Sequence, residues 1–163
     1  MKIRFIAAAA AAALTGITGL AASTGTAGAA EAPGHLILHG GPDALYTTGA
    51  PGSVVRFGRY RASNHGEDFN ADHFANAYGA GAFYWAPGGA QTNDYLKVTT
   101  SGATLVSGAP HATIFAPIAH GAYTVFATLS GGKPSKNVLT DVGGHAVIAK
   151  EGATPSSSQL WKV

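Results

Sequence analysis

Short runs of aliphatic and aromatic residues alternate with clusters of turn-forming residues along the chain after residue 30. Glycine and proline recur every few residues, and no long window repeats apolar residues at the helical period, so helix signals are scarce. The turn clusters include residues 40–43, 87–89 and 131–134. Between such clusters we expect strands at residues 36–38, 53–57, 82–86, 95–99, 104–106, 113–115, 122–129, 137–140, 146–149 and 159–163. Many short strands at this spacing predict an all-β barrel or sandwich.

Three stretches share one skeleton, in which two strands joined by a glycine turn are followed by a longer loop and a third strand with a large aromatic residue. The last stretch has its strands at 138–141, 146–149 and 159–163, with the turn at Gly143-Gly144. The middle stretch has them at 95–98, 104–106 and 113–115, with the turn at Ser101-Gly102. The first and faintest has them at 36–38, 45–47 and 54–57, with the turn at Gly40-Gly41. We therefore expect three degenerate repeats in a single domain, residues 30–163.

The spacing of the repeats requires an insertion after the first. Leu96 lies 60 residues after Leu36, whereas Leu139 lies 43 residues after Leu96. We place the insertion at about residues 60–81, the most polar part of the chain after residue 30, and expect it to lie outside the core. Its polar side chains include His65, Glu67, Asp68, Asn70, Asp72 and His73. Their spacing fits neither the calcium loop nor the zinc signatures, so we expect a solvated loop or short helix, with no metal site and no other cofactor.

Two motifs resemble those of a known superfamily. Gln159-Leu160-Trp161 matches the Gln-x-Trp motif of ricin-B-like proteins, and Tyr95-Leu96-Lys97-Val98 with Ser101-Gly102 is similar to the fascin-like pattern. Over most of residues 34–163, the chain thus resembles the β-trefoil superfamily. This resemblance implies an all-β trefoil of three degenerate repeats around a pseudo-threefold axis, with a long insertion after the first. A β-sandwich with hairpin connections is the alternative.

The resemblance also implies carbohydrate binding. In the family, a functional repeat has a shallow pocket in which an acidic or amide side chain hydrogen-bonds to the sugar while an aromatic ring stacks on it. Asp141 matches the acidic position of the ricin-like pattern, so we predict that Asp141 contacts a ligand. Gln159 and Trp161 match residues that are chiefly structural in that family. Because a tryptophan supplies a large apolar area, we expect Trp161 in the core.

A second candidate site lies near the run Phe83-Tyr84-Trp85. Alternation along a strand places Phe83 and Trp85 on one side and Tyr84 on the other, and we expect the pair to pack in the core. The alternative is a groove in which an aromatic ring borders two polar residues. This alternative predicts glycan contacts at Tyr84, Asn93 and Asp94.

The first 29 residues have the features of a secretory signal peptide. Two basic residues precede an apolar run over residues 5–14, and the small residues 27–29 offer a cleavage site. Polar and small residues from Thr15 onward interrupt the run before it reaches the roughly 18 residues that a spanning helix needs. We expect cleavage before Ala30 and a secreted, extracellular protein without a membrane segment.

Removal of the signal peptide changes the charge balance. Lys2 and Arg4 are two of the ten basic residues, and all eight carboxylates follow residue 29. The formal net charge of +2 therefore belongs to the precursor, and the formal net charge of the mature chain is zero. This balance gives no reason to expect nucleic-acid binding. Arg56, Arg59 and Arg61 cluster, which fits a solvated strand edge as well as a phosphate site. Absence of cysteine excludes disulfides and thiolate metal sites.

Motifs of catalysis are also missing. The sequence contains no Gly-x-Ser-x-Gly elbow, no His-Glu-x-x-His helix and no phosphate-binding glycine loop. We therefore expect a non-catalytic binding module that is lectin-like and recognises an extracellular glycan or polysaccharide. The alternative is a secreted protein-binding domain such as a protease inhibitor, whose inhibitory loops would be residues 107–111 or 152–158.

Overall fold

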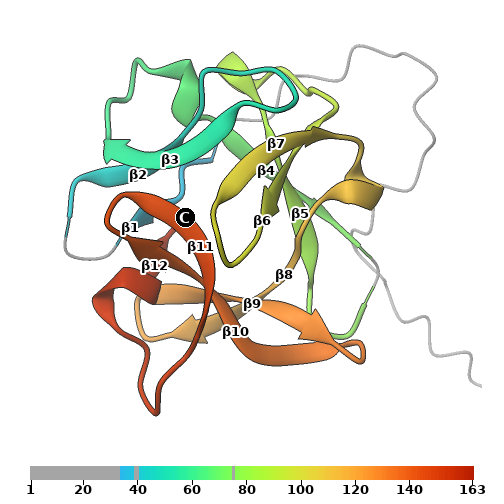
Figure 1. Ribbon diagram of the computed structural model, residues 1–163, viewed down its shortest axis with the longest axis vertical. Coiled ribbons are helices and arrows are strands. Elements are labelled where there is room, and N and C mark those ends of the chain that lie inside the picture. The colour runs from blue at the N-terminus through green and yellow to red at the C-terminus, as the bar shows by residue number, and fades with distance from the viewer. Residues whose placement is uncertain (1–33, 39–40, 75) are drawn as a thin grey trace, which may run out of the picture.

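A computed structural model describes residues 34–38, 41–74 and 76–163 (Figure 1). The predicted signal peptide, residues 1–29, and its cleavage site before Ala30 lie outside these residues. The strands are β1 (Ile37–Leu38), β2 (Asp43–Tyr46), β3 (Val54–Arg59), β4 (Phe69–His73), β5 (Gly81–Trp85), β6 (Asp94–Val98), β7 (Ala103–Ser107), β8 (Ile114–His120), β9 (Tyr123–Ser130), β10 (Lys133–Val142), β11 (His145–Lys150) and β12 (Trp161–Lys162). The short 3₁₀ helices are η1 (His65–Glu67), η2 (Pro87–Gly89), η3 (Ala109–His111) and η4 (Ser157–Gln159). The all-β prediction is confirmed.

All these strands belong to one antiparallel sheet. Three hairpins join β2 to β3, β6 to β7 and β10 to β11, and each is paired along most of its length. No helix among the described residues has the length and apolar character needed to cross a membrane.

The remaining strands follow one another around a ring. β12 pairs with β1 and β9, β9 pairs with β8, β8 with β5, and β5 with β4. β4 then returns to the segment that leads into β1, because the Phe69 N–H donates to the Gly34 carbonyl at 3.0 Å. These six contacts leave few free edges where another chain could pair.

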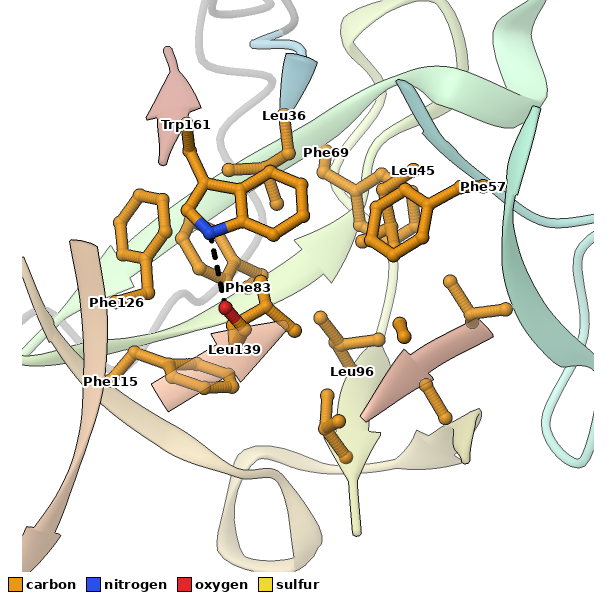
Figure 2. Packing of buried hydrophobic residues seen from close by; sticks show 14 of the residues in the cluster. Leu36, Leu45, Phe57, Phe69, Phe83, Leu96, Phe115, Phe126, Leu139 and Trp161 are labelled. Atoms are coloured by element: carbon orange, nitrogen blue, oxygen red, sulfur yellow. Dashed lines mark hydrogen bonds between the residues drawn. The ribbon is translucent and has the colours of Figure 1, made fainter. Parts of the chain in front are cut away.

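The core fills the space inside these strands (Figure 2). Trp161 is fully buried, its ring stacks on Phe57 with centroids 5.1 Å apart, and its Nε1 donates to the Leu139 carbonyl at 3.3 Å. Inward alternation of strand residues, such as Val55 and Phe57 on β3, supplies the rest of the cluster. The expected core position of Trp161 is confirmed.

Three short 3₁₀ helices each precede a strand with a buried aromatic residue. η1 leads to Phe69, η3 to Phe115 and η4 to Trp161, and all three rings lie in the core. In η4 the Gln159 side chain accepts from the backbone N–H of Ser156, which caps the turn. The segment Glu67-Asp68-Phe69 therefore holds the place in the first unit that Gln159-Leu160-Trp161 holds in the last.

The expectation that residues 60–81 form an insertion outside the core is wrong. This stretch contains β4, which pairs with β5 at every residue from Phe69↔Trp85 to His73↔Gly81. Phe69 lies in the main core, and Glu67 and Asp68 are buried beside it. The polar residues misled because the buried carboxylates of Glu67 and Asp68 have hydrogen-bond partners, which offset the usual penalty of burying them.

The first unit also begins its hairpin one strand later than predicted. The long pairing joins β2 to β3, whereas among the described residues β1 and β2 are in register at Ile37↔Ala44 alone. The chain reverses between β2 and β3 with Gly49 at a φ of +86° and Gly52 at +88°, a left-handed region that favours glycine. These two glycines lie in the turn of the β2–β3 hairpin, and Gly40 of the predicted Gly40-Gly41 turn lies outside the described residues.

A second, smaller cluster on the outer side of β5 yields a prediction about alkaline pH. The Tyr95 hydroxyl donates to Asp72 Oδ2 at 3.0 Å, and burial, followed by this hydrogen bond and the Asp72 charge, raises the pKa of Tyr95 to about 12. The neutral phenol therefore stabilises the fold below pH 10, and this contribution is lost as the pH rises from about 10 to 12. Urea denaturation across this range should show a steeper loss for the wild type than for Tyr95→Phe. Equal slopes would contradict the assignment.

Candidate ligand-binding site

An open polar pocket of about 510 Å³ lies beside the β2–β3 hairpin. It is formed by the outer face of this hairpin and the segment that connects β3 to η1. Its lining residues are Tyr46, Gly58, Arg59, Arg61, Ser63, Asn64 and Glu67. One aromatic ring, one amide, one hydroxyl and three charged groups therefore surround a single space, which we call the Tyr46 pocket.

Tyr46 forms the aromatic wall of the pocket. Ala44 pairs with Gly58 and Tyr46 with Arg56, so the Tyr46 ring lies on the outer face of β3 across Gly58. A Cβ atom at Gly58 would come within 2.7 Å of Tyr46 Cε1, closer than such contacts allow. Gly58 thus lets the ring lie against the strand, while part of it stays exposed to the pocket.

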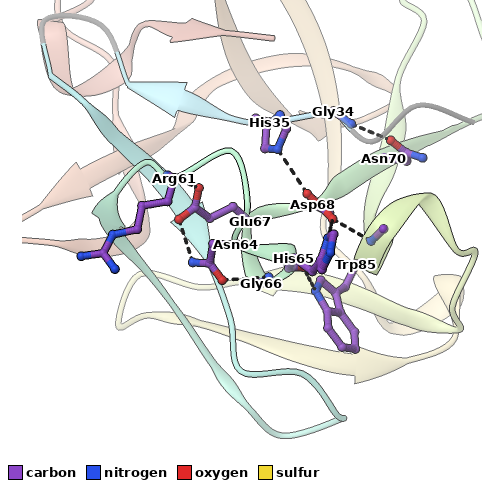
Figure 3. Close-up of polar contacts among 11 residues, drawn as sticks. Gly34, His35, Arg61, Asn64, His65, Gly66, Glu67, Asp68, Asn70 and Trp85 are labelled. Carbon is purple, nitrogen blue, oxygen red and sulfur yellow. Dashed lines mark hydrogen bonds and ion pairs between the residues drawn. The ribbon is translucent and has the colours of Figure 1, made fainter.

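Glu67 forms the floor. Its side chain is only 1% exposed, Oε2 accepts from the Arg61 N–H at 2.8 Å and Oε1 accepts from Asn64 Nδ2 at 2.7 Å (Figure 3). Asn64 is also the cap of η1, since its Oδ1 accepts from the Gly66 N–H at 3.2 Å. Glu67 therefore holds both the backbone at Arg61 and the amide of Asn64 in place.

Asp68 ties the site to the rest of the domain. Its carboxylate is 3.2 Å from His35 Nε2 and 2.9 Å from His65 Nδ1, and it accepts from the Gly88 N–H at 2.7 Å (Figure 3). Trp85 Nε1 donates to the His65 carbonyl at 3.0 Å. One buried carboxylate thus connects the segment before β1, the η1 turn and the η2 turn.

Asp141, the predicted ligand contact, lies on β10 near the turn of its hairpin. Its Oδ1 accepts from the Gly144 N–H at 2.8 Å, which closes the turn between β10 and β11. The carboxylate is half-buried. A turn-closing role explains this geometry, and ligand contact by Asp141 stays a prediction.

The other predicted contacts lie on β5 and at the start of β6. Tyr84 is 7% exposed and packs in the second cluster, where its ring centroid is 5.9 Å from that of Tyr95. Asn93 is exposed and its Nδ2 donates to Ser107 Oγ at 3.1 Å, whereas Asp94 is half-buried. The Tyr84 ring is thus covered by protein and offers no open stacking face. Asn93 and Asp94 lie at the start of the β6–β7 hairpin, whereas Asp141 lies on the β10–β11 hairpin.

The histidines and acids of residues 65–73 are dispersed rather than gathered around one point. His65 contacts Asp68, whereas His73 is exposed and its Nδ1 lies 3.4 Å from the Gly79 carbonyl. Across the described ranges, no three His, Asp or Glu side chains converge as metal ligands would.

The pocket residues Tyr46, Asn64 and Glu67 were not predicted as a site. Asn64-x-x-Glu67 is a helix-capping pattern, and it could have marked the η1 turn within the supposed insertion. No local signal places this turn beside Tyr46, because the two segments are brought together by tertiary contacts such as the Thr47 N–H to Gly66 carbonyl bond at 2.9 Å.

The sequence matches no protein-family model and no curated protein. Among solved structures, the chain is similar in fold to a Polyporus squamosus lectin. The TM-score is 0.57 with 12% identity, and the match covers 81% of this chain and 49% of the lectin chain, so this chain spans about half the length of that protein. The lectin was solved with the human-type influenza-binding epitope Neu5Acα2-6Galβ1-4GlcNAc bound. At this identity the likeness shows a shared β-rich fold alone.

Proposed function

We propose that this protein is a secreted, non-catalytic, glycan-binding module with a β-trefoil fold, and that the Tyr46 pocket is its glycan site. The signal-like N-terminus supports secretion. The observation that carries the binding proposal is the pocket itself, where an aromatic wall and an amide stand over a fully buried, hydrogen-bonded carboxylate.

The trefoil arrangement has three lines of support. Three hairpins, β2–β3, β6–β7 and β10–β11, recur at matching places in the chain. Six other strands contact one another in a ring. Each third of the chain ends with a 3₁₀ helix and a strand bearing a buried aromatic residue.

The chemistry of the pocket suits a sugar. The exposed part of the Tyr46 ring offers an apolar face for a pyranose, while Asn64, Ser63 and the arginines offer donors and acceptors for hydroxyl groups. Glu67 holds Asn64 and the backbone at Arg61 in position before any ligand arrives, which lowers the entropy cost of binding. The lectin of similar fold adds support for glycans as the ligand class.

A glycan array with purified protein tests this proposal. Tyr46→Ala should lower the affinity for bound glycans by roughly tenfold or more, because the ring supplies the stacking surface. The control is Tyr78→Ala, which removes an exposed tyrosine outside the pocket and should leave binding intact. Asp141→Ala, assayed on the same array, tests the predicted ligand contact of Asp141 on β10. A blank array with well-folded protein would contradict the proposal.

A further inference from the structure

We infer that the Tyr46 pocket selects acidic saccharides, whose carboxylate is held by Arg59 and Arg61. The inference rests on the proposed function and adds the chemical class of its ligand. It starts from an arginine cluster that neither the core nor any hairpin explains.

Arginine is concentrated at this one place in the chain. Apart from Arg4, the only arginines are Arg56, Arg59 and Arg61, and all other basic charge after residue 30 comes from lysine and histidine. Arg59 ends β3, Arg61 follows two residues later, and both are exposed and line the pocket. Arg56, in contrast, is exposed on the same strand without lining it.

The two pocket guanidinium groups are not neutralised by the protein. In the described part of the chain the ion pairs join Asp68 to His35 and to His65, and none includes Arg59 or Arg61. Asp43 faces Arg59 in the strand register but makes no ion pair with it there. Arg59 and Arg61 are therefore available to a ligand.

The carboxylate of the pocket, in contrast, already has hydrogen-bond partners within the protein. Each oxygen of Glu67 has a donor, the Arg61 N–H or Asn64 Nδ2, and the side chain is almost completely buried. Figure 3 shows the Arg61 side chain extending away from the Glu67 carboxylate, with only its backbone N–H facing it. The pocket lining thus carries the charges of two exposed arginines against one buried carboxylate, a formal excess of one positive charge, although the mature chain as a whole is balanced.

Carboxylate is a group that this arrangement fits. A guanidinium presents paired N–H donors in the spacing of the two carboxylate oxygens, and such charge-assisted bonds are stronger than neutral ones. A uronic or sialic acid residue carries its carboxylate directly on the pyranose ring. Its ring can lie against Tyr46 while the carboxylate reaches the arginines at the rim.

Binding to matched pairs of glycans tests the inference. One pair is an oligogalacturonate and its methyl ester, and the other is a sialylated lactosamine and its desialylated form. Isothermal titration should show at least about tenfold tighter binding of the acidic member in at least one pair, and the pair that responds distinguishes uronate from sialate. The preference should weaken as salt is raised from 50 to 500 mM, because exposed charges are screened.

Arg59→Gln and Arg61→Gln should each remove most of the difference in affinity between the acidic and the neutral glycan of a pair. The matched control is Arg56→Gln, which removes the same charge from the same strand and should keep the difference. Arg61→Gln leaves the backbone bond to Glu67 in place, and thermal denaturation verifies that the variants remain folded.

Different failures have different meanings. Binding of both members with equal affinity, in a manner that still needs Tyr46, would overturn the inference and leave the proposed function standing. An equal loss of the affinity difference in Arg56→Gln would also overturn the inference, since the effect would then come from the overall positive charge of the protein and not from the pocket. Failure of every member of both pairs to bind would overturn the proposed function and the inference together.

Discussion

Replacing Trp161 with alanine should lower the free energy of unfolding by about 3–5 kcal/mol. The indole is fully buried, stacks on Phe57 and donates to the Leu139 carbonyl, so the change leaves a cavity and an unpaired buried oxygen. Trp161 also lies on β12, which links β1 to β9 in the ring of strands. Urea denaturation followed by far-ultraviolet circular dichroism measures the loss.

The control for this prediction is Trp161→Phe. Phenylalanine already fills the corresponding core positions at Phe69 and Phe115, so it should keep most of the packing and lose mainly the hydrogen bond. We expect a cost of about half that of the alanine variant. A loss below about 1 kcal/mol in Trp161→Ala would mean that the three aromatic residues do not share the core as the structure has them.

Replacing Asp68 with alanine should cost about 2–4 kcal/mol, the second largest effect. The carboxylate is 2% exposed and binds groups from three separate segments, at His35, His65 and the Gly88 N–H. Its removal leaves the Gly88 N–H without its acceptor and detaches the segment before β1 from η1. Denaturation at neutral pH measures the change, and hydrogen exchange should show faster opening near η1 and η2.

The control for the Asp68 variant is Asp94→Ala. Asp94 is a half-buried carboxylate on β6 that makes no side-chain hydrogen bond within the described residues, so its loss should cost less than about 1 kcal/mol. Equal costs for the two variants would indicate that the contacts of Asp68 add nothing beyond an ordinary surface carboxylate.

The strands that the pattern predicted well are those with apolar side chains and clear turns. The hairpins β6–β7 and β10–β11 have such strands, and both lie where the repeat analysis placed them. β4 was missed because only one of its five residues, Phe69, is a large apolar residue. Its neighbours are polar, and polar residues ordinarily indicate a solvated segment.

The candidate site, too, could be predicted from the sequence only in part. The sequence identified the arginine cluster and the polar segment after it, but it provided no reason to connect either with Tyr46. The predicted contact at Asp141 rested on a motif position, and the structure places its carboxylate at the Gly144 N–H. The interpretation of Tyr84 relied on alternation along the strand, which correctly places Tyr84 and Phe83 on opposite faces of β5. Alternation does not reveal that Tyr95 and its neighbours cover the face that bears Tyr84.

The sequence alone determined the all-β class, the strand–turn rhythm and the burial of Trp161, because each follows from local periodicity, from glycine and proline turns and from the size of one apolar side chain. Only the tertiary structure decided that residues 69–73 belong to the sheet and that the Tyr46 pocket exists. Burial of Glu67 and Asp68 is tolerable because their partners, such as the Gly88 N–H and His35, come from distant segments. Such partners become neighbours only when the whole chain has folded, so no local pattern carries the information.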